Sequence, residues 1–151
     1  MPETTPAVIV IDHGSRREES NAMLLEVVAL FREVAGYAIV EPAHMELAEP
    51  SLATAFARCA EQGARRVVVH PLFLLPGRHW SEDIPRLAAE AAENHPGLEF
   101  LVTAPLGVHG LLAELMQVRI AQCLAHAGGD GPDCSLCRES GLCRWRGGEP
   151  G

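Results

Sequence analysis

The sequence is poor in aromatic residues, in positive charge and in long apolar segments. Aromatics make up 5% of its 151 residues, which indicates a core of aliphatic side chains. Asp and Glu total 20 against 12 for Lys and Arg, so the net charge is −8. This balance argues against nucleic acid or an acidic membrane as the main partner. No apolar run reaches the ~18 residues of a membrane span.

The sequence also has little that is typical of a secreted protein. Residues 1–6 are acidic rather than basic and precede only five apolar residues, so we expect no signal peptide and predict a cytoplasmic location. Five cysteines are an odd number for a compartment expected to be reducing. A disulfide framework is therefore a poor interpretation, and a metal or cluster site is a better one for cysteines that lie close together.

What the sequence does contain is a regular alternation of strand and helix patterns. We expect strands over 7–11, 37–43, 67–74 and 98–102. We expect helices over 18–35, 51–62, 81–94 and 108–125, the third capped by Ser81. Crossovers of this length imply a four-stranded parallel sheet with helices on both faces. The α/β domain is predicted to span 1–127, followed by a tail over 128–151 that is rich in Gly, Pro and Cys.

Three polar side chains follow three of the predicted strands. His13 follows the first strand, Glu46 the second and His79 the third. In open α/β sheets ligands bind at the carboxyl edge, where the strand order reverses. In the common order 2-1-3-4 that point lies between the strands that carry the two histidines. Taken singly, each residue is more often a solvated loop residue. Together they predict a site for a divalent metal with nitrogen and oxygen ligands.

The segment Gly14-Ser15-Arg16-Arg17 lies between the first strand and the first helix. Its backbone amides near a helix start, together with two guanidinium groups, suit a carboxylate or a phosphate. A tight turn with solvated arginines is an equally good interpretation. No complete glycine-rich nucleotide motif is present.

Three further cysteines, Cys134, Cys137 and Cys143, lie within ten residues of the tail. This spacing favours a bound Zn²⁺ ion or an iron–sulfur cluster, although thiols that bind nothing remain an alternative. Cys123, His126 or a second chain could supply a fourth ligand.

Three motifs in order give the chain a family resemblance. Val8-Ile9-Val10-Ile11-Asp12-His13-Gly14-Ser15-Arg16 comes first, then Met45-Glu46-Leu47-Ala48-Glu49-Pro50-Ser51, then Pro71-Leu72-Phe73-Leu74-Leu75-Pro76-Gly77-Arg78-His79 with Asp83-Ile84-Pro85. They resemble the sirohydrochlorin chelatases, which insert cobalt or ferrous iron into a tetrapyrrole for cobalamin or siroheme synthesis. The tail cysteines are not part of the family motifs.

The resemblance implies a chelatase-like fold, equivalent to one flavodoxin-like half, and the short form of the family, which acts as a homodimer. It implies that His13, His79 and Glu46 handle Co²⁺ or Fe²⁺. The residues agree with this chemistry, because an imidazole can both release a metal ion and accept a proton. Arg16, Arg17 and Arg78 could pair with the carboxylates of sirohydrochlorin. The alternative is a metallochaperone or sensor that binds metal without turnover.

Overall fold

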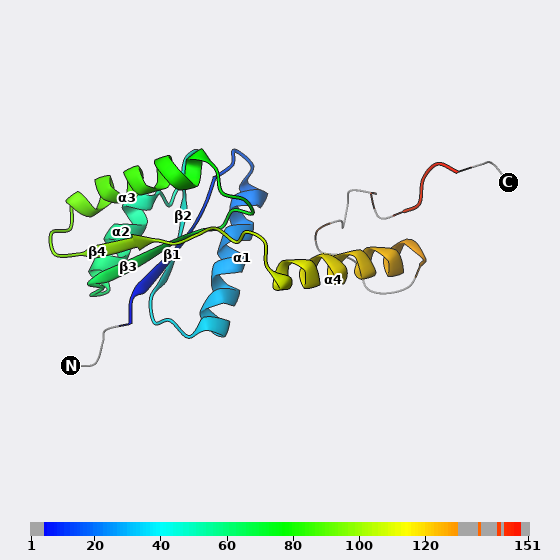
Figure 1. The fold of residues 1–151 in the computed structure, drawn as a ribbon, viewed down its shortest axis with the longest axis horizontal. Coiled ribbons are helices and arrows are strands. Elements are labelled where there is room, and N and C mark those ends of the chain that lie inside the picture. The colour runs from blue at the N-terminus through cyan, green and yellow to red at the C-terminus, as the bar shows by residue number, and fades with distance from the viewer. Residues whose placement is uncertain (1–4, 130–135, 137–141, 143, 149–151) are drawn as a thin grey trace. The chain divides into compact units, whose positions relative to one another are not determined.

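Four parallel strands form one sheet in the order β2-β1-β3-β4 (Figure 1). They are β1 (Ala7–Asp12), β2 (Val40–His44), β3 (Arg66–Pro71) and β4 (Glu99–Val102). The computed structural model describes residues 5–129, 136, 142 and 144–148. The chain divides into two units, Met1–Gly107 and Val108–Gly151, and the whole sheet lies in the first. The predicted parallel sheet and its order are confirmed.

Three helices of the first unit cover the two faces of the sheet. They are α1 (Glu18–Ala35), α2 (Leu52–Glu61) and α3 (Ile84–Glu93). A single turn of π-helix, η1 (His79–Asp83), leads directly into α3. Helix α1 packs on one face, and α2 and α3 pack on the other. The predicted arrangement of helices on both faces is therefore correct.

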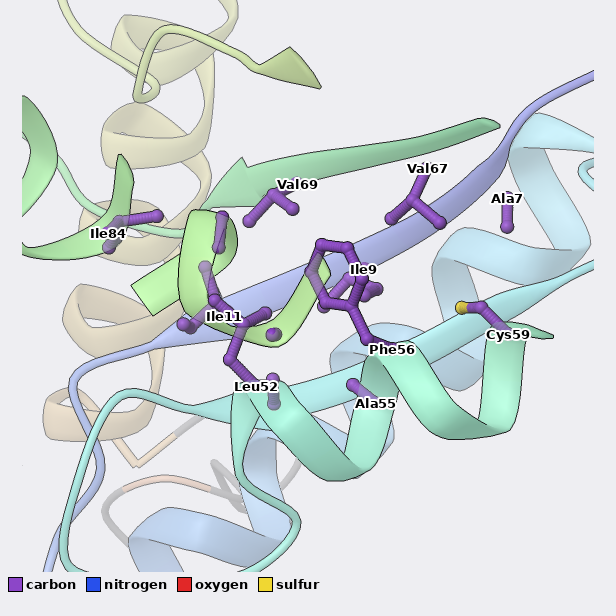
Figure 2. Close-up of a cluster of buried hydrophobic side chains, with 13 residues drawn as sticks. Ala7, Ile9, Ile11, Leu52, Ala55, Phe56, Cys59, Val67, Val69 and Ile84 are labelled. Atoms are coloured by element: carbon purple, nitrogen blue, oxygen red, sulfur yellow. The ribbon is translucent and has the colours of Figure 1, made fainter. Parts of the chain in front are cut away.

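The larger core cluster lies between the sheet and helices α2 and α3. Figure 2 shows the Phe56 ring of α2 directed at the strands, beside Ile9 of β1 and near Val67 of β3. Phe56 and Ile9 are both fully buried. Most of the other members are small or aliphatic, as the low aromatic content predicted. This packing fixes the face of β1 from which Ile9 and Ile11 project.

A smaller cluster lies on the opposite face of the sheet. Val8 and Val10 of β1 pack there against Leu24 and Val28 of α1. Successive residues of a strand point to opposite faces, so a strand that is buried on both sides needs a continuous apolar run. β1 has such a run and is buried from Ala7 to Ile11. The first polar residue, Asp12, ends the strand.

Several element boundaries differ from those expected. The third strand ends at Pro71 rather than at Leu74. The second strand begins at Val40 rather than at Tyr37, whose ring stacks on Phe31 of α1 at 5.8 Å between centroids. Ser81 does not cap the third helix. Its amide already donates to the Gly77 carbonyl at 2.9 Å, so helical winding starts earlier and continues through η1.

The second unit contains α4 (Gly110–Ala127). His109 precedes it, and its Nδ1 accepts a hydrogen bond from the Leu111 amide at 3.1 Å, which caps the helix. Within the described residues, no helix combines the length and the apolarity needed to cross a bilayer. The boundary expected between a domain over 1–127 and a tail over 128–151 stays a prediction.

Candidate functional site

The structure brings His13, Glu46 and His79 together at the carboxyl edge of the sheet. His13 Nε2 lies 3.3 Å from Glu46 Oε1. The His13 and His79 rings meet edge to face, with 4.9 Å between their centroids and 75° between their planes. The three side chains are 45%, 53% and 52% exposed, so about half of each is accessible from solvent.

Strand pairing places these residues side by side. Asp12 of β1 pairs with His44 of β2, and the hydrogen bonding continues past both strand ends. The Met45 amide donates to the Asp12 carbonyl at 2.8 Å, and the Glu46 amide donates to the His13 carbonyl at 3.1 Å. The contact between His13 and Glu46 is therefore built on a backbone ladder.

Gly14 allows the two connections to approach each other closely. Its φ is +90°, and a Cβ at this position would collide with the Glu46 carbonyl oxygen. The same Cβ would lie 3.2 Å from the Cβ of His44. Only glycine satisfies both the backbone angle and the close approach. Gly14 thus acts in the site through packing.

A hydrogen-bonded pair, Asp12 and the buried His44, lies at these strand ends. His44 Nδ1 is 2.6 Å from Asp12 Oδ1, and the His44 side chain is 2% exposed. Neither residue is among the site residues predicted from the sequence. The sequence does place them near predicted site residues: Asp12 directly precedes His13, and His44 lies two residues before Glu46. The pair joins the ends of β1 and β2 below His13 and Glu46.

Asp83 is a second carboxylate that sequence reasoning did not assign. It ends η1, and its Oδ2 lies 2.7 Å from Nδ1 of His79 at the start of the same turn. The spacing of four residues between a histidine and an acid was the available signal. Asp83 Oδ1 also faces Arg86 at 3.8 Å.

The Gly14–Arg17 segment is held by its own hydrogen bonds. The Ser15 amide donates to Asn21 Oδ1 at 3.0 Å, and Asn21 Nδ2 donates to the Ser15 carbonyl at 2.7 Å. The Arg17 amide donates to Ser15 Oγ at 3.0 Å. The amides of Ser15 and Arg17 are thus paired with side chains in this structure, and anion binding by the segment stays a prediction. The side chains of Arg16 and Arg17 are exposed.

His70 of β3 is half-buried, and its Nδ1 lies 2.9 Å from Thr103 Oγ1. Burial lowers the pKa of its imidazole. The Trp80 indole, which sequence reasoning did not single out, donates to the Thr103 carbonyl at 2.8 Å and ties η1 to the end of β4. Both residues therefore support the edge of the sheet next to the site.

The three donors are neighbours without forming a finished metal cage. Among the described residues, no three His, Cys, Asp or Glu side chains are arranged to hold a metal ion. His13 and Glu46 instead face each other through the atoms that would bind one. Cys134, Cys137 and Cys143 lie outside the described residues. The suggested fourth ligands, Cys123 and His126, are half-buried in α4.

Comparisons with known proteins match this fold. The family model CbiX matches residues 7–123. Over 137 residues the chain is 56% identical to a chloroplastic sirohydrochlorin ferrochelatase of Arabidopsis thaliana, covering 91% of this chain and 61% of that one. The chain thus spans less than two thirds of the length of that relative.

The solved structures that are similar to this chain include the following two. The cobalt complex of the sirohydrochlorin chelatase SirB from Bacillus subtilis subspecies spizizenii has a TM-score of 0.73 at 27% identity, over 78% of this chain and 50% of SirB. A CbiX protein of Marinobacter aquaeolei, named for cobalamin (vitamin B12) biosynthesis, has a TM-score of 0.68 at 28% identity. That match covers 81% of this chain and 99% of the other.

The matched region holds the complete parallel sheet and all three polar connections at its carboxyl edge, so fold and sequence define one class of α/β protein. The chain belongs to the CbiX family, the sirohydrochlorin chelatase family that its motifs resemble.

We expect Gly14→Ala to disturb the site and the fold together. The added methyl group meets the Glu46 carbonyl, and the positive φ is strained for alanine. The free energy of unfolding should fall by more than about 1 kcal/mol, measured by denaturant titration. Gly36→Ala is the matched control, because Gly36 also has a positive φ but its Cβ would meet no atom. An equal loss in both variants would show that the close approach to Glu46 is unimportant.

Proposed function

We propose that this protein is a sirohydrochlorin chelatase that inserts Co²⁺ or Fe²⁺ into its tetrapyrrole substrate. The observation that carries the proposal is the meeting of His13, Glu46 and His79 at the open edge of the sheet in a member of this family. In the reaction, a hydrated metal ion replaces two pyrrole N–H protons, so two protons leave. The site must therefore hold the ion weakly and accept protons.

The donor set suits both requirements. Imidazole and carboxylate ligands bind first-row divalent ions and exchange them more readily than a set of thiolates would. The side chains are about half-exposed, so a hydrated ion and a planar macrocycle can both approach them. Glu46 lies within reach of the His13 imidazole and can share a proton with it. We assign metal transfer to the two histidines and proton acceptance to His13 and Glu46.

We assign substrate binding to the arginines that flank the histidines. Arg16 and Arg17 follow His13, Arg78 precedes His79, and all three are exposed. Sirohydrochlorin is a polycarboxylate, and guanidinium groups bind carboxylates through paired hydrogen bonds. Because the chain carries a net charge of −8, attraction of this anion has to be local. Cobalt and iron both suit a nitrogen and oxygen site, and we include both ions in the proposal.

The competing function is a metallochaperone or sensor with the same ligands. Turnover separates the two. The test is an anaerobic absorbance assay of sirohydrochlorin with Co²⁺ or with Fe²⁺. Product that exceeds the protein many times over supports the enzyme, and uptake of one ion per chain without product contradicts it.

We expect His13→Ala and His79→Ala each to reduce chelation severely, and Glu46→Ala to impair it. Removal of a general base typically lowers a rate by about 10²–10⁴-fold. Initial rates in the absorbance assay provide the measurement. His95→Ala is the control, since this histidine lies in the turn after α3. Near-normal turnover in the double variant of His13 and His79 would contradict the assignment.

We propose that two copies form a homodimer with two-fold symmetry. One sheet edge contacts a planar macrocycle from one side, and a second copy would cover the other side. The chain matches only 50% of the SirB chain, which supports a dimer in which two copies together correspond to one SirB chain. We expect light scattering to give twice the 16.2 kDa of one chain. A fully active monomer would contradict the dimer.

We further propose, from the sequence, that Cys134, Cys137 and Cys143 bind Zn²⁺ or an iron–sulfur cluster that is separate from chelation. Cys123, His126 or a second copy of the chain would supply the fourth ligand. A bound group of this kind would supply structural support or electron transfer.

We expect anaerobically purified protein to contain zinc or iron, and the variant with serine at Cys134 and Cys137 to lose it. A chain that ends at residue 127 should retain chelation, because it keeps the complete alternating pattern. Metal analysis, visible absorbance and the chelation assay provide the measurements. Metal-free protein whose tail thiols titrate freely would contradict the metal site, and loss of chelation in the short chain would contradict its independence.

The cytoplasmic location also stays a prediction, since the Arabidopsis relative is named as chloroplastic.

A further inference from the structure

The His79 imidazole has a fixed partner on one of its two nitrogens. Nδ1 lies 2.7 Å from Oδ2 of Asp83, within η1. An ionised carboxylate only accepts hydrogen bonds, so the proton of this contact belongs to Nδ1. In the neutral ring the lone pair is then on Nε2. We propose that Asp83 is a positioning residue that holds His79 in the tautomer whose Nε2 binds the metal ion. This inference rests on the proposed role of His79 as a ligand.

Asp83 is well placed for this task because the core anchors it. The next residue, Ile84, is fully buried in the larger core cluster. The Ile84 amide also donates to the His79 carbonyl, which closes the π-helical turn. Asp83 and the backbone of His79 are thus both tied to the buried Ile84. Single π-helical turns are often found at functional sites.

The other contacts of Asp83 leave this arrangement intact. Arg86 faces the second oxygen, Oδ1, at 3.8 Å, so Oδ2 remains with His79. Arg86 also pairs with Glu90 at 3.3 Å. The His13 ring also meets the His79 ring edge to face. The His79 ring thus has two neighbours in the site, the Asp83 carboxylate at Nδ1 and the His13 imidazole. Carboxylate partners of this kind orient metal-binding histidines and raise metal affinity.

The test measures Co²⁺ binding and the histidine tautomer on the full chain without sirohydrochlorin. Absorbance titration gives the Co²⁺ affinity, and ¹⁵N NMR of the metal-free imidazoles shows which nitrogen of His79 carries the proton. In Asp83→Ala we expect the proton to move from Nδ1 toward Nε2 and the Co²⁺ affinity to fall by about 10–100-fold. In Asp83→Asn the amide oxygen can still accept the Nδ1 proton, so a smaller loss is expected with the tautomer retained.

Two variants serve as controls. Glu82→Gln removes an equal charge from the same turn, and Arg86→Gln removes the other partner of Asp83. Both should bind Co²⁺ as the wild type does and keep the Nδ1 proton on His79. A fall in affinity in Glu82→Gln equal to that in Asp83→Ala would assign the effect to charge alone and overturn the inference.

His79→Ala separates this inference from the proposed function. If His79→Ala binds Co²⁺ as tightly as the wild type, His79 is not a ligand and the proposed site fails. If His79→Ala loses affinity while Asp83→Ala keeps both its affinity and the Nδ1 proton, the site stands and the role of Asp83 is overturned. Equal losses in Asp83→Ala and Asp83→Asn without a change of tautomer would show a purely structural role and would also overturn it.

Discussion

The site depends on the pairing of one buried strand with a neighbour on each side. β1 pairs in parallel with β2 and with β3, and all three end at the same edge. Side chains pack on both faces of β1. A shift of its register by one residue would therefore move an apolar side chain out of the core or draw Asp12 into it. The position of His13 is thus set by core packing rather than by contacts within the site. The hydrogen bonds donated by the Met45 and Glu46 amides extend the same register into the connection that follows β2.

Most of this fold could be predicted from the sequence because its signals are local and repeated. The apolar run of β1, the spacing of Leu24 and Val28 in α1 and the glycine that ends α1 each have one good structural interpretation. The closeness of His13 and Glu46 followed from topology, since parallel strands in this order end together, whereas His79 lies beyond the connection that follows β3. The predicted helix start at Ser81 was wrong, because the Ser81 amide already donates to the Gly77 carbonyl within an earlier turn.

The rest of the site could not be predicted, because it depends on contacts between side chains. Asp12 and His44 are separated by 32 residues, and only the register of β1 against β2 shows that they form a pair. Likewise, the closed loop around Ser15 needs the Asn21 side chain to turn back toward it. The sequence indicated a polar segment near a helix start but not which amides were already satisfied. Composition and spacing therefore identify the donors, and three-dimensional structure identifies the groups that hold them.

The three donors differ in how firmly the fold holds them. His13 directly follows the most buried strand, and Glu46 follows an edge strand. His79 lies beyond the 72–78 connection, in which Leu74 and Leu75 are exposed. An ion shared by these residues would thus sit among donors that are fixed in different ways: His13 by the central strand, Glu46 by the edge strand, and His79 by the turn that ends at the buried Ile84. Its bonds to the protein could break singly, in an order set by backbone anchorage, as bonds to an incoming macrocycle form.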